Sequence, residues 1–363
     1  MELAPTLTSQ TIQNRVREVG INPNYWYPVA WADRLQPGKI LPVMVWQQAI
    51  AVYRDINGQL HALEDACPHK GVALHQGKVQ GDNLVCPYHG WQFNRNGKCV
   101  NIPYLPEGQK LPCAQAASYP VQEKYNIIWV FPSNSNLAEN TPLPDVPEYE
   151  HPDWLLVPIP AHFQAHFSIC NENTMDVFHG FLHQDLQGWF DPVLLNLHQN
   201  ERSVQAKYQV SYQGWMTKFL GFSEHGNQVT TRTISINYEY PHYRSSIEGV
   251  SSIYLMRLPV GMTETKSFSL LFLKVGLPKW MLKRIKPQLS QMIWRFLFKK
   301  FLDQDIEMIE SEQRTYLANP GRRYVEINPA IIALQRLIVG QYEEFMQQSR
   351  KLSNSSRNHQ KEK

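Results

Sequence analysis

The segment that organises this chain is residues 67–91, CPHKGVALHQGKVQGDNLVCPYHGW. It contains two short loops, Cys67-x-His69 and Cys86-x-x-His89, separated by sixteen residues. Each loop offers one thiolate, which suits a soft metal or an iron–sulfur cluster, and one imidazole, which suits zinc, copper or iron. Proline and glycine beside these residues favour tight, stiff turns, because proline restricts φ and glycine adopts conformations that other residues resist. The segment therefore predicts a metal centre held by two loops.

Two kinds of metal centre use two cysteines and two histidines. Structural zinc sites usually pair like with like, as Cys-x2-4-Cys and His-x3-5-His. Here each loop mixes one Cys with one His, as two bridged irons require when both cysteines bind one iron and both histidines the other. The mixed spacing favours a Rieske [2Fe–2S] cluster, and zinc remains the alternative.

Both loops resemble those of ring-hydroxylating Rieske oxygenases, which read CxH(R/K)G and CxYHGW. The Rieske proteins of respiratory complexes carry an extra cysteine in each loop, whereas position 88 here is Tyr and no cysteine closely follows His69. The resemblance implies that Cys67, His69, Cys86 and His89 bind the cluster.

Length and composition narrow the class of protein. The 363 residues predict two domains, and a net charge of +3 is too small to indicate nucleic-acid binding. The other cysteines, Cys99, Cys113 and Cys170, have no disulfide-framework spacing, so we expect ordinary thiols. The N-terminal residues lack the apolar run of a secretory signal, and no stretch of about 18 apolar residues predicts a membrane span. We expect a cytoplasmic protein.

The pattern predicts an α+β chain with an all-β Rieske domain followed by a catalytic domain. Short strand-like runs fill the first domain, and Asn57-Gly58 is a strong hairpin signal. Alternating apolar residues predict four strands in the second domain, and two amphipathic helices follow. The expected domains are 25–132, a linker 133–153, the catalytic domain 154–352 and a disordered tail 353–363. The expected strands are 203–212, 229–240, 249–258 and 266–273, and the expected helices are 287–319 and 329–352.

A second cluster of metal-binding residue types lies in the catalytic domain. His179 and His183 are four residues apart, which places both on one face of a helix, and Asp176 shares that face. Non-haem iron oxygenases hold Fe(II) with two histidines and one carboxylate, leaving positions open for O2 and substrate. The carboxylate is expected from a distant segment, and Asp305 is the preferred residue. Asp303, Glu307 and Glu310 are its rivals.

This segment also resembles the iron motif of Rieske oxygenases, N-x-x-D-x-x-H-x(3,4)-H, with Asn173 and Asp176 on the first two positions. The resemblance implies that His179 and His183 bind iron together with Asp305. It also implies that Asp176 links an iron-bound histidine to a cluster histidine of a neighbouring subunit. One departure is that three residues separate the two histidines, where the family usually has four. His198 is the fallback ligand.

The resemblance covers most of the chain and is nearest to vanillate demethylases and the chlorophyllide and pheophorbide a oxygenases. The latter end in membrane helices and a Cys-x-x-Cys that this chain lacks. The resemblance implies a START-like helix-grip catalytic domain with a curved antiparallel sheet. It also implies a homotrimeric ring in which one subunit's cluster abuts the next subunit's iron.

A basic, aromatic-rich stretch spans residues 279–302, KWMLKRIKPQLSQMIWRFLFKKFL, with seven Lys or Arg and no acid. Such a stretch suits an anionic membrane surface. It equally suits an acidic electron donor such as a ferredoxin. A solvated basic face over a buried apolar face is the third interpretation.

Together these features predict an oxygenase that inserts oxygen from O2 into an organic substrate, cyclic or lipophilic, by hydroxylation or oxidative demethylation. No Gly-x-Gly-x-x-Gly fingerprint follows a strand, so an external ferredoxin or NAD(P)H-dependent reductase is expected to supply electrons. The alternative is a Rieske electron carrier or ligand-binding protein whose second domain lacks catalytic iron.

Overall fold

The computed structural model describes residues 11–133, 135–186, 189–213, 229–275 and 279–361, without the side chains of 279–283 and 352–361. The chain forms two compact units, one of Pro23–Leu143 and one of Met1–Asn22 with Pro144–Lys363. The division falls inside the predicted linker 133–153, which also contains the short helix α2 (Ser135–Ala138). The sequence did not predict that residues before Pro23 belong to the second unit.

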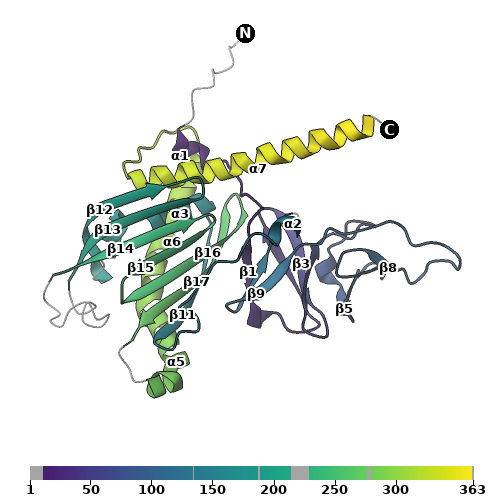
Figure 1. Ribbon diagram of the computed structural model, residues 1–363, viewed down its shortest axis with the longest axis horizontal. Helices are drawn as coiled ribbons and strands as arrows, with labels where there is room; N and C mark the ends of the chain where they lie inside the picture. Colours follow the sequence, from purple (N-terminus) through teal and green to yellow (C-terminus); the bar gives the residue numbers. More distant parts are fainter. Residues whose placement is uncertain (1–10, 134, 187–188, 214–228, 276–278, 362–363) are drawn as a thin grey trace, which may run out of the picture. The chain divides into compact units, whose positions relative to one another are not determined.

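The first unit consists of three small antiparallel sheets (Figure 1). The predicted hairpin is confirmed, because β3 and β4 pair on either side of Gly58, whose φ of 84° is positive. The strands are β1 (Tyr27–Trp31), β10 (Ile127–Val130) and β9 (Val121–Lys124); β2 (Ile40–Val45), β3 (Gln48–Arg54) and β4 (Leu60–Glu64); and β5 (Lys78–Gln80), β6 (Asn83–Val85), β7 (Gln92–Phe93) and β8 (Cys99–Asn101).

The second unit contains a seven-stranded antiparallel sheet in the order β11-β17-β16-β15-β14-β13-β12. The four predicted strands are confirmed, but β11, β12 and β15 were not predicted. β11 and β12 are the two edge strands of this sheet, and both contain proline. Edge strands tolerate proline, but a proline in the sequence counts against the prediction of a strand. The strands are β11 (Trp154–Phe163), β12 (Trp189–Gln199), β13 (Ser203–Tyr212), β14 (Thr230–Glu239), β15 (His242–Ile247), β16 (Ser251–Gly261) and β17 (Glu264–Lys274).

Helices pack on this sheet and complete the expected α+β fold (Figure 1). Apolar side chains of α5, η4 and α6 bury β11 and β17, and a second apolar cluster joins α3 to α6. The elements are α1 (Ile12–Arg15), α3 (Phe167–Met175), the 3-10 segment η3 (Phe178–Leu186), α5 (Lys279–Ile293), the π-helical turn η4 (Trp294–Phe298), α6 (Lys299–Ala318) and α7 (Pro329–Lys361).

The C-terminal helix differs from the expectation of a disordered tail over 353–363. α7 continues past Leu352 to Lys361. No Pro or Gly lies between these positions to end the helix, so a polar composition alone does not stop it. None of the helices in the described residues is long and apolar enough to span a membrane.

Candidate active site

The two predicted cluster loops have the same backbone turn. In the first loop, the amide of Gly71 donates to the carbonyl of Cys67 at 2.8 Å, and in the second the amide of Gly90 donates to that of Cys86 at 3.1 Å. Both glycines have positive φ, 71° and 69°, which explains glycine at these positions. The cysteine amides close each turn by donating to Val72 and Trp91. The loops therefore present their Cys and His side chains in equivalent ways.

The ligand side chains of the two loops lie together and differ in exposure. Cys67 and Cys86 are buried, whereas His69 and His89 are partly exposed with ring centroids 4.7 Å apart. Burial, together with the neighbouring Cys86 thiol, raises the pKa of the free Cys67 thiol to about 11. Nδ1 of His89 is buried with no hydrogen-bond partner among the described residues, and a metal ion would satisfy it. The set fits a cluster with thiolates inside and imidazoles toward solvent.

His179, His183 and Asp305 converge from η3 and α6. Each offers one ligand atom, and these atoms lie within 4.8 Å of one another. Asp305 Oδ1 is 3.2 Å from Nε2 of His183 and 3.7 Å from Nε2 of His179. Ligands about 2.1 Å from one metal, with angles of 90–120°, lie about 3.0–3.6 Å apart. The group therefore fits a single metal ion held by two His and one carboxylate.

The local backbone differs from the predicted helix. α3 ends at Met175, and both histidines lie in the 3-10 segment η3, with non-helical φ and ψ at His183. Gly180 lies so close to Trp189 that an added Cβ would come within 2.5 Å of its carbonyl oxygen. His179 and His183, separated by three residues, can therefore bind one metal ion because this turn brings them together. They do not share the face of an α-helix.

The rival ligands lie elsewhere. Asp303 pairs with Lys299, and Glu310 accepts a hydrogen bond from the backbone amide of Gln164. Glu307 and His198 are exposed, and neither belongs to the metal-binding group found among the described residues.

Gln304 is a candidate site residue that the sequence did not point to. Its Oε1 accepts a hydrogen bond from Nδ1 of His183 at 2.9 Å, and its Nε2 donates to Asp185 at 3.1 Å. This contact directs Nε2 of His183 toward Asp305 and fixes the ring orientation, as supporting hydrogen bonds commonly do for metal-bound histidines. A glutamine beside a predicted ligand was the only available sequence signal.

Asn173 and Asp176 lie beside the group. Nδ2 of Asn173 donates to Oδ1 of Asp305 at 3.4 Å. Asp176 accepts hydrogen bonds from the amide of Phe178 at 2.9 Å and from the side chain of Asn328 at 3.5 Å. Nδ1 of His179 is buried without a hydrogen-bond partner among the described residues.

The two histidines titrate in opposite directions. Burial lowers the pKa of His179, and the charges of Asp305 and Asp176 offset this only in part. Burial also acts to lower the pKa of His183, but the hydrogen bond and charge of Asp305 outweigh it and raise that pKa. Neutral imidazole is the form that binds a metal, so loading of the site competes with protonation of His183.

A cavity of about 310 Å³ opens onto the side chains of His179, His183 and Asp305 and is lined by residues of the sheet. This volume lies within the range of small-molecule sites, about 300–1,000 Å³. The apolar and aromatic lining comprises Val177, Trp189, Tyr212, Ile234, Ile236, Ile247, Val250, Ile253, Leu271, Leu273, Phe298 and Phe301. Such a wall suits an apolar ligand.

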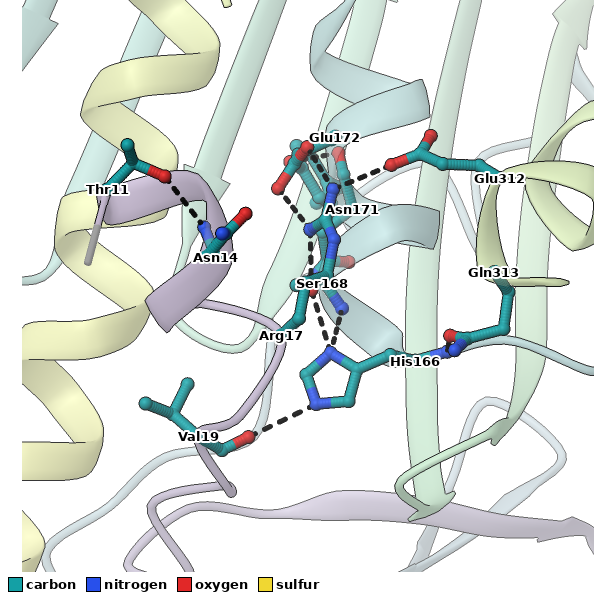
Figure 2. Close-up of polar contacts among 11 residues, drawn as sticks. Thr11, Asn14, Arg17, Val19, His166, Ser168, Asn171, Glu172, Glu312 and Gln313 are labelled. Atoms are coloured by element: carbon teal, nitrogen blue, oxygen red, sulfur yellow. Dashed lines mark hydrogen bonds and ion pairs between the residues drawn. The ribbon is translucent and has the colours of Figure 1, made fainter. Parts of the chain in front are cut away.

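The segment before Pro23 fastens the two helices that lead to the site (Figure 2). Buried Arg17 donates to both carboxylate oxygens of Glu172 at 2.5 and 2.7 Å, to Ser168 at 2.7 Å and to Glu312 at 2.8 Å. Glu172 belongs to α3, and Glu312 lies seven residues after Asp305 on α6. Burial alone would lower the pKa of Arg17, but Glu172 and Glu312 outweigh it and raise that pKa.

Comparison with known proteins agrees with this geometry. The Rieske [2Fe-2S] domain family matches residues 25–120, and the vanillate O-demethylase oxygenase C-terminal domain family matches residues 163–339. The chain is 35% identical over 342 residues to 4beta-methylsterol monooxygenase of Methylococcus capsulatus, covering 92% of each protein. The chain belongs to the Rieske-type oxygenases.

Solved structures show the same fold at low identity. Dicamba monooxygenase bound to 3,6-dichlorosalicylic acid superposes with a TM-score of 0.73 at 22% identity, covering 89% of this chain and 98% of that one. NdmB of Pseudomonas putida CBB5 gives a TM-score of 0.65 at 20% identity, covering 91% and 94%.

Membership in the family confirms several expectations from the sequence. This Rieske oxygenase is an oxidoreductase of the monooxygenase or dioxygenase type with a [2Fe–2S] cluster and non-haem iron as cofactors. The family implies electron-transfer partners, a small organic substrate and O2.

Proposed function

We propose that this oxygenase inserts oxygen into a carbon–hydrogen bond of a lipophilic polycyclic substrate, with iron held by His179, His183 and Asp305. The observation that carries the proposal is the apolar cavity that opens directly onto these three side chains. In the same proposal Cys67, His69, Cys86 and His89 hold the cluster that supplies single electrons.

Bound iron supplies the site for O2 activation, and the residues of the chain determine what reaches it. Three protein ligands leave coordination positions free for O2, as in other sites with two His and one carboxylate. The apolar wall excludes water and accepts a ring system by shape and burial, since it offers few hydrogen bonds. The indole of Trp189 donates to the carbonyl of Val177 at 2.5 Å, which holds the wall against η3.

The substrate class rests on the cavity and on the most extensive sequence match reported above. That relative is named for a 4β-methylsterol, which is a polycyclic molecule. A curved sheet lined by branched aliphatic side chains suits such a rigid ring system.

Replacing Asp305 tests the iron assignment. Asp305→Ala should lose the mononuclear iron and turnover while keeping the spectrum of the reduced cluster, because the two centres share no ligand. Asp303→Asn, which alters an exposed neighbour on the same helix, is the matched control. Retention of the extra iron by Asp305→Ala together with its loss in a Glu307 or Glu310 variant would move the ligand along α6.

The substrate class is tested by turnover with a generic ferredoxin and reductase. A methylsterol should gain one oxygen atom from labelled O2, detected by mass spectrometry. The competing function, an electron carrier without catalytic iron, predicts only the two irons of the cluster per chain and no oxygenated product.

The oligomer that we propose is a homotrimeric ring. The sequence positions of the cluster ligands and of Asp176 place them in different compact units. A heterologous interface that closes on itself would bring one subunit's His89 to the next subunit's Asp176. Asp176→Asn should then keep both metal centres but slow electron transfer to the iron, which rapid-mixing spectroscopy of the cluster measures. Normal single-turnover kinetics in this variant, or full activity of a dilute monomer, would contradict the ring.

A peripheral membrane contact is part of the same proposal. Met292 and Phe296 are exposed one turn apart, and exposed Arg295, Lys299 and Lys300 flank them. The side chains of 279–283 lie outside the described residues. A basic face with exposed apolar residues suits an anionic bilayer, where a lipophilic substrate dissolves. Sedimentation with vesicles of phosphatidylglycerol should retain the wild type, whereas Phe296→Ser with Arg295→Gln should release it. Equal sedimentation of both would remove this contact.

A further inference from the structure

Two serines interrupt the apolar wall that the sheet contributes to the cavity. The register of β14 to β17 directs every second residue to the cavity, and these positions are aliphatic except at Ser245 and Ser251. Ser245 lies opposite Ile253, and Ser251 lies opposite Ile247, so the two serines are diagonal neighbours on adjacent strands. Ser246, between Ser245 and Ile247, also lines the cavity, although strand alternation directs its side chain toward the other face of the sheet.

Several other polar side chains of the cavity already have partners. The hydroxyl of Thr174 accepts from buried Arg257 at 2.6 Å and donates to the carbonyl of Cys170 at 3.4 Å. Trp189 donates to a backbone carbonyl, and Asp176 accepts two hydrogen bonds. Within the described residues, no hydrogen bond engages the hydroxyl of Ser245 or Ser251.

We infer that Ser245 and Ser251 form a polar subsite for a hydroxyl or carbonyl oxygen of the substrate. The inference rests on the proposed function and specifies its substrate as an oxygen-bearing lipophile, such as a polycyclic alcohol. Diagonal neighbours on paired strands have Cα atoms about 7–8 Å apart, with side chains closer. One oxygen can accept or donate at about 2.8 Å to each of two hydroxyls that lie within about 5.6 Å of each other.

The position of this subsite gives it a role in orientation. The serines belong to β15 and β16 of the sheet, whereas the metal-binding side chains come from η3 and α6. An apolar wall alone would let a ring system rotate, and a single anchored oxygen defines which end of the molecule lies at the sheet. A site with such hydroxyls also rejects an analogue without the oxygen, because the serine hydroxyls then lose water and gain no partner.

Equilibrium dialysis of the holoenzyme with a steroid alcohol and its parent hydrocarbon, androstan-3β-ol and androstane, tests the subsite without turnover. The wild type should bind the alcohol at least about tenfold more tightly than the hydrocarbon, in the range that an unpaired hydroxyl produces. Ser245→Ala and Ser251→Ala should each reduce this preference by about fivefold. Ser235→Ala, on the neighbouring strand β14 and outside the cavity lining, should leave it unchanged.

Two outcomes overturn the inference: no preference for the alcohol in the wild type, or the same preference in both alanine variants. If neither steroid binds, the proposed substrate class is wrong. The serine subsite is then decided by the same comparison with 2-naphthol and naphthalene, which are small enough for any apolar cavity of this size. A naphthol preference lost in Ser245→Ala and Ser251→Ala supports the subsite, and its absence refutes it.

Discussion

Replacing Arg17 by Met should strongly destabilise the oxygenase unit. The Arg17 side chain is 3% exposed and that of Glu172 is 9% exposed, so the substitution leaves a buried carboxylate without its cation. Removing one partner of a buried ion pair costs about 3–5 kcal/mol. Glu312 adds little to this figure, because its side chain is 51% exposed.

Arg15, at the end of α1 and two residues before Arg17, offers a matched control. It pairs with Glu343 on α7, and the two side chains are 53% and 39% exposed. Exposed pairs of this kind contribute about 0–1 kcal/mol. Arg15→Met therefore changes the same residue types at nearly the same place in the chain without burying an unpaired charge.

The assay is hydrogen exchange of peptides from α3 and α6, with the visible absorbance of the cluster as a measure of the other unit. Exchange in these helices should accelerate by about 100-fold or more in Arg17→Met, since each 1.4 kcal/mol is a factor of ten, while the cluster absorbance stays normal. Equal effects of Arg17→Met and Arg15→Met would refute the role assigned to the buried network.

Two further predictions concern the site and its support. Gln304→Leu should weaken Fe(II) binding by about 10–100-fold, because His183 loses the hydrogen bond that orients its ring. Titration of iron into the enzyme after chelation measures this affinity. Asp303→Asn, at an exposed neighbouring position, should bind iron normally, and equal affinities in both variants would contradict the role of Gln304. Burial, with the charge of Arg17, lowers the pKa of His166 to about 3, well below the unfolded value of about 6.5. The unfolded chain therefore binds a proton that the native state does not, so stability should fall as pH drops below about 6.5, by up to about 1.4 kcal/mol per pH unit. His166→Asn keeps a residue that can cap α3. In denaturant titrations, the free energy of unfolding of this variant should depend less on pH than that of the wild type. An unchanged pH dependence would show that His166 does not cause the loss of stability at low pH.

The cluster site could be predicted from the sequence because its determinants are local. Cys67 and His69 lie within one turn, as do Cys86 and His89, and glycine at the position of positive φ in each loop makes that turn accessible. The hairpin at Asn57-Gly58 and the four alternating strands followed for the same reason, since periodicity and turn residues act over a few positions. The pair His179 and His183 was predicted from its spacing together with the Rieske loops upstream and the resemblance to the family's iron motif.

Tertiary structure decided what depends on segments far apart in sequence. Asp305 lies more than 120 residues after His183, and only the packing of α6 against α3 and the sheet selects it over Asp303, Glu307 and Glu310. The edge strands with prolines, the 3-10 turn at Gly180 and the contact of Gln304 with His183 also arise from long-range packing. The sequence does not single out Arg17 in its polar N-terminal segment. Its burial between Glu172 and Glu312 exists only in the folded chain, because charge pairing across α3 and α6 has no local signature in sequence.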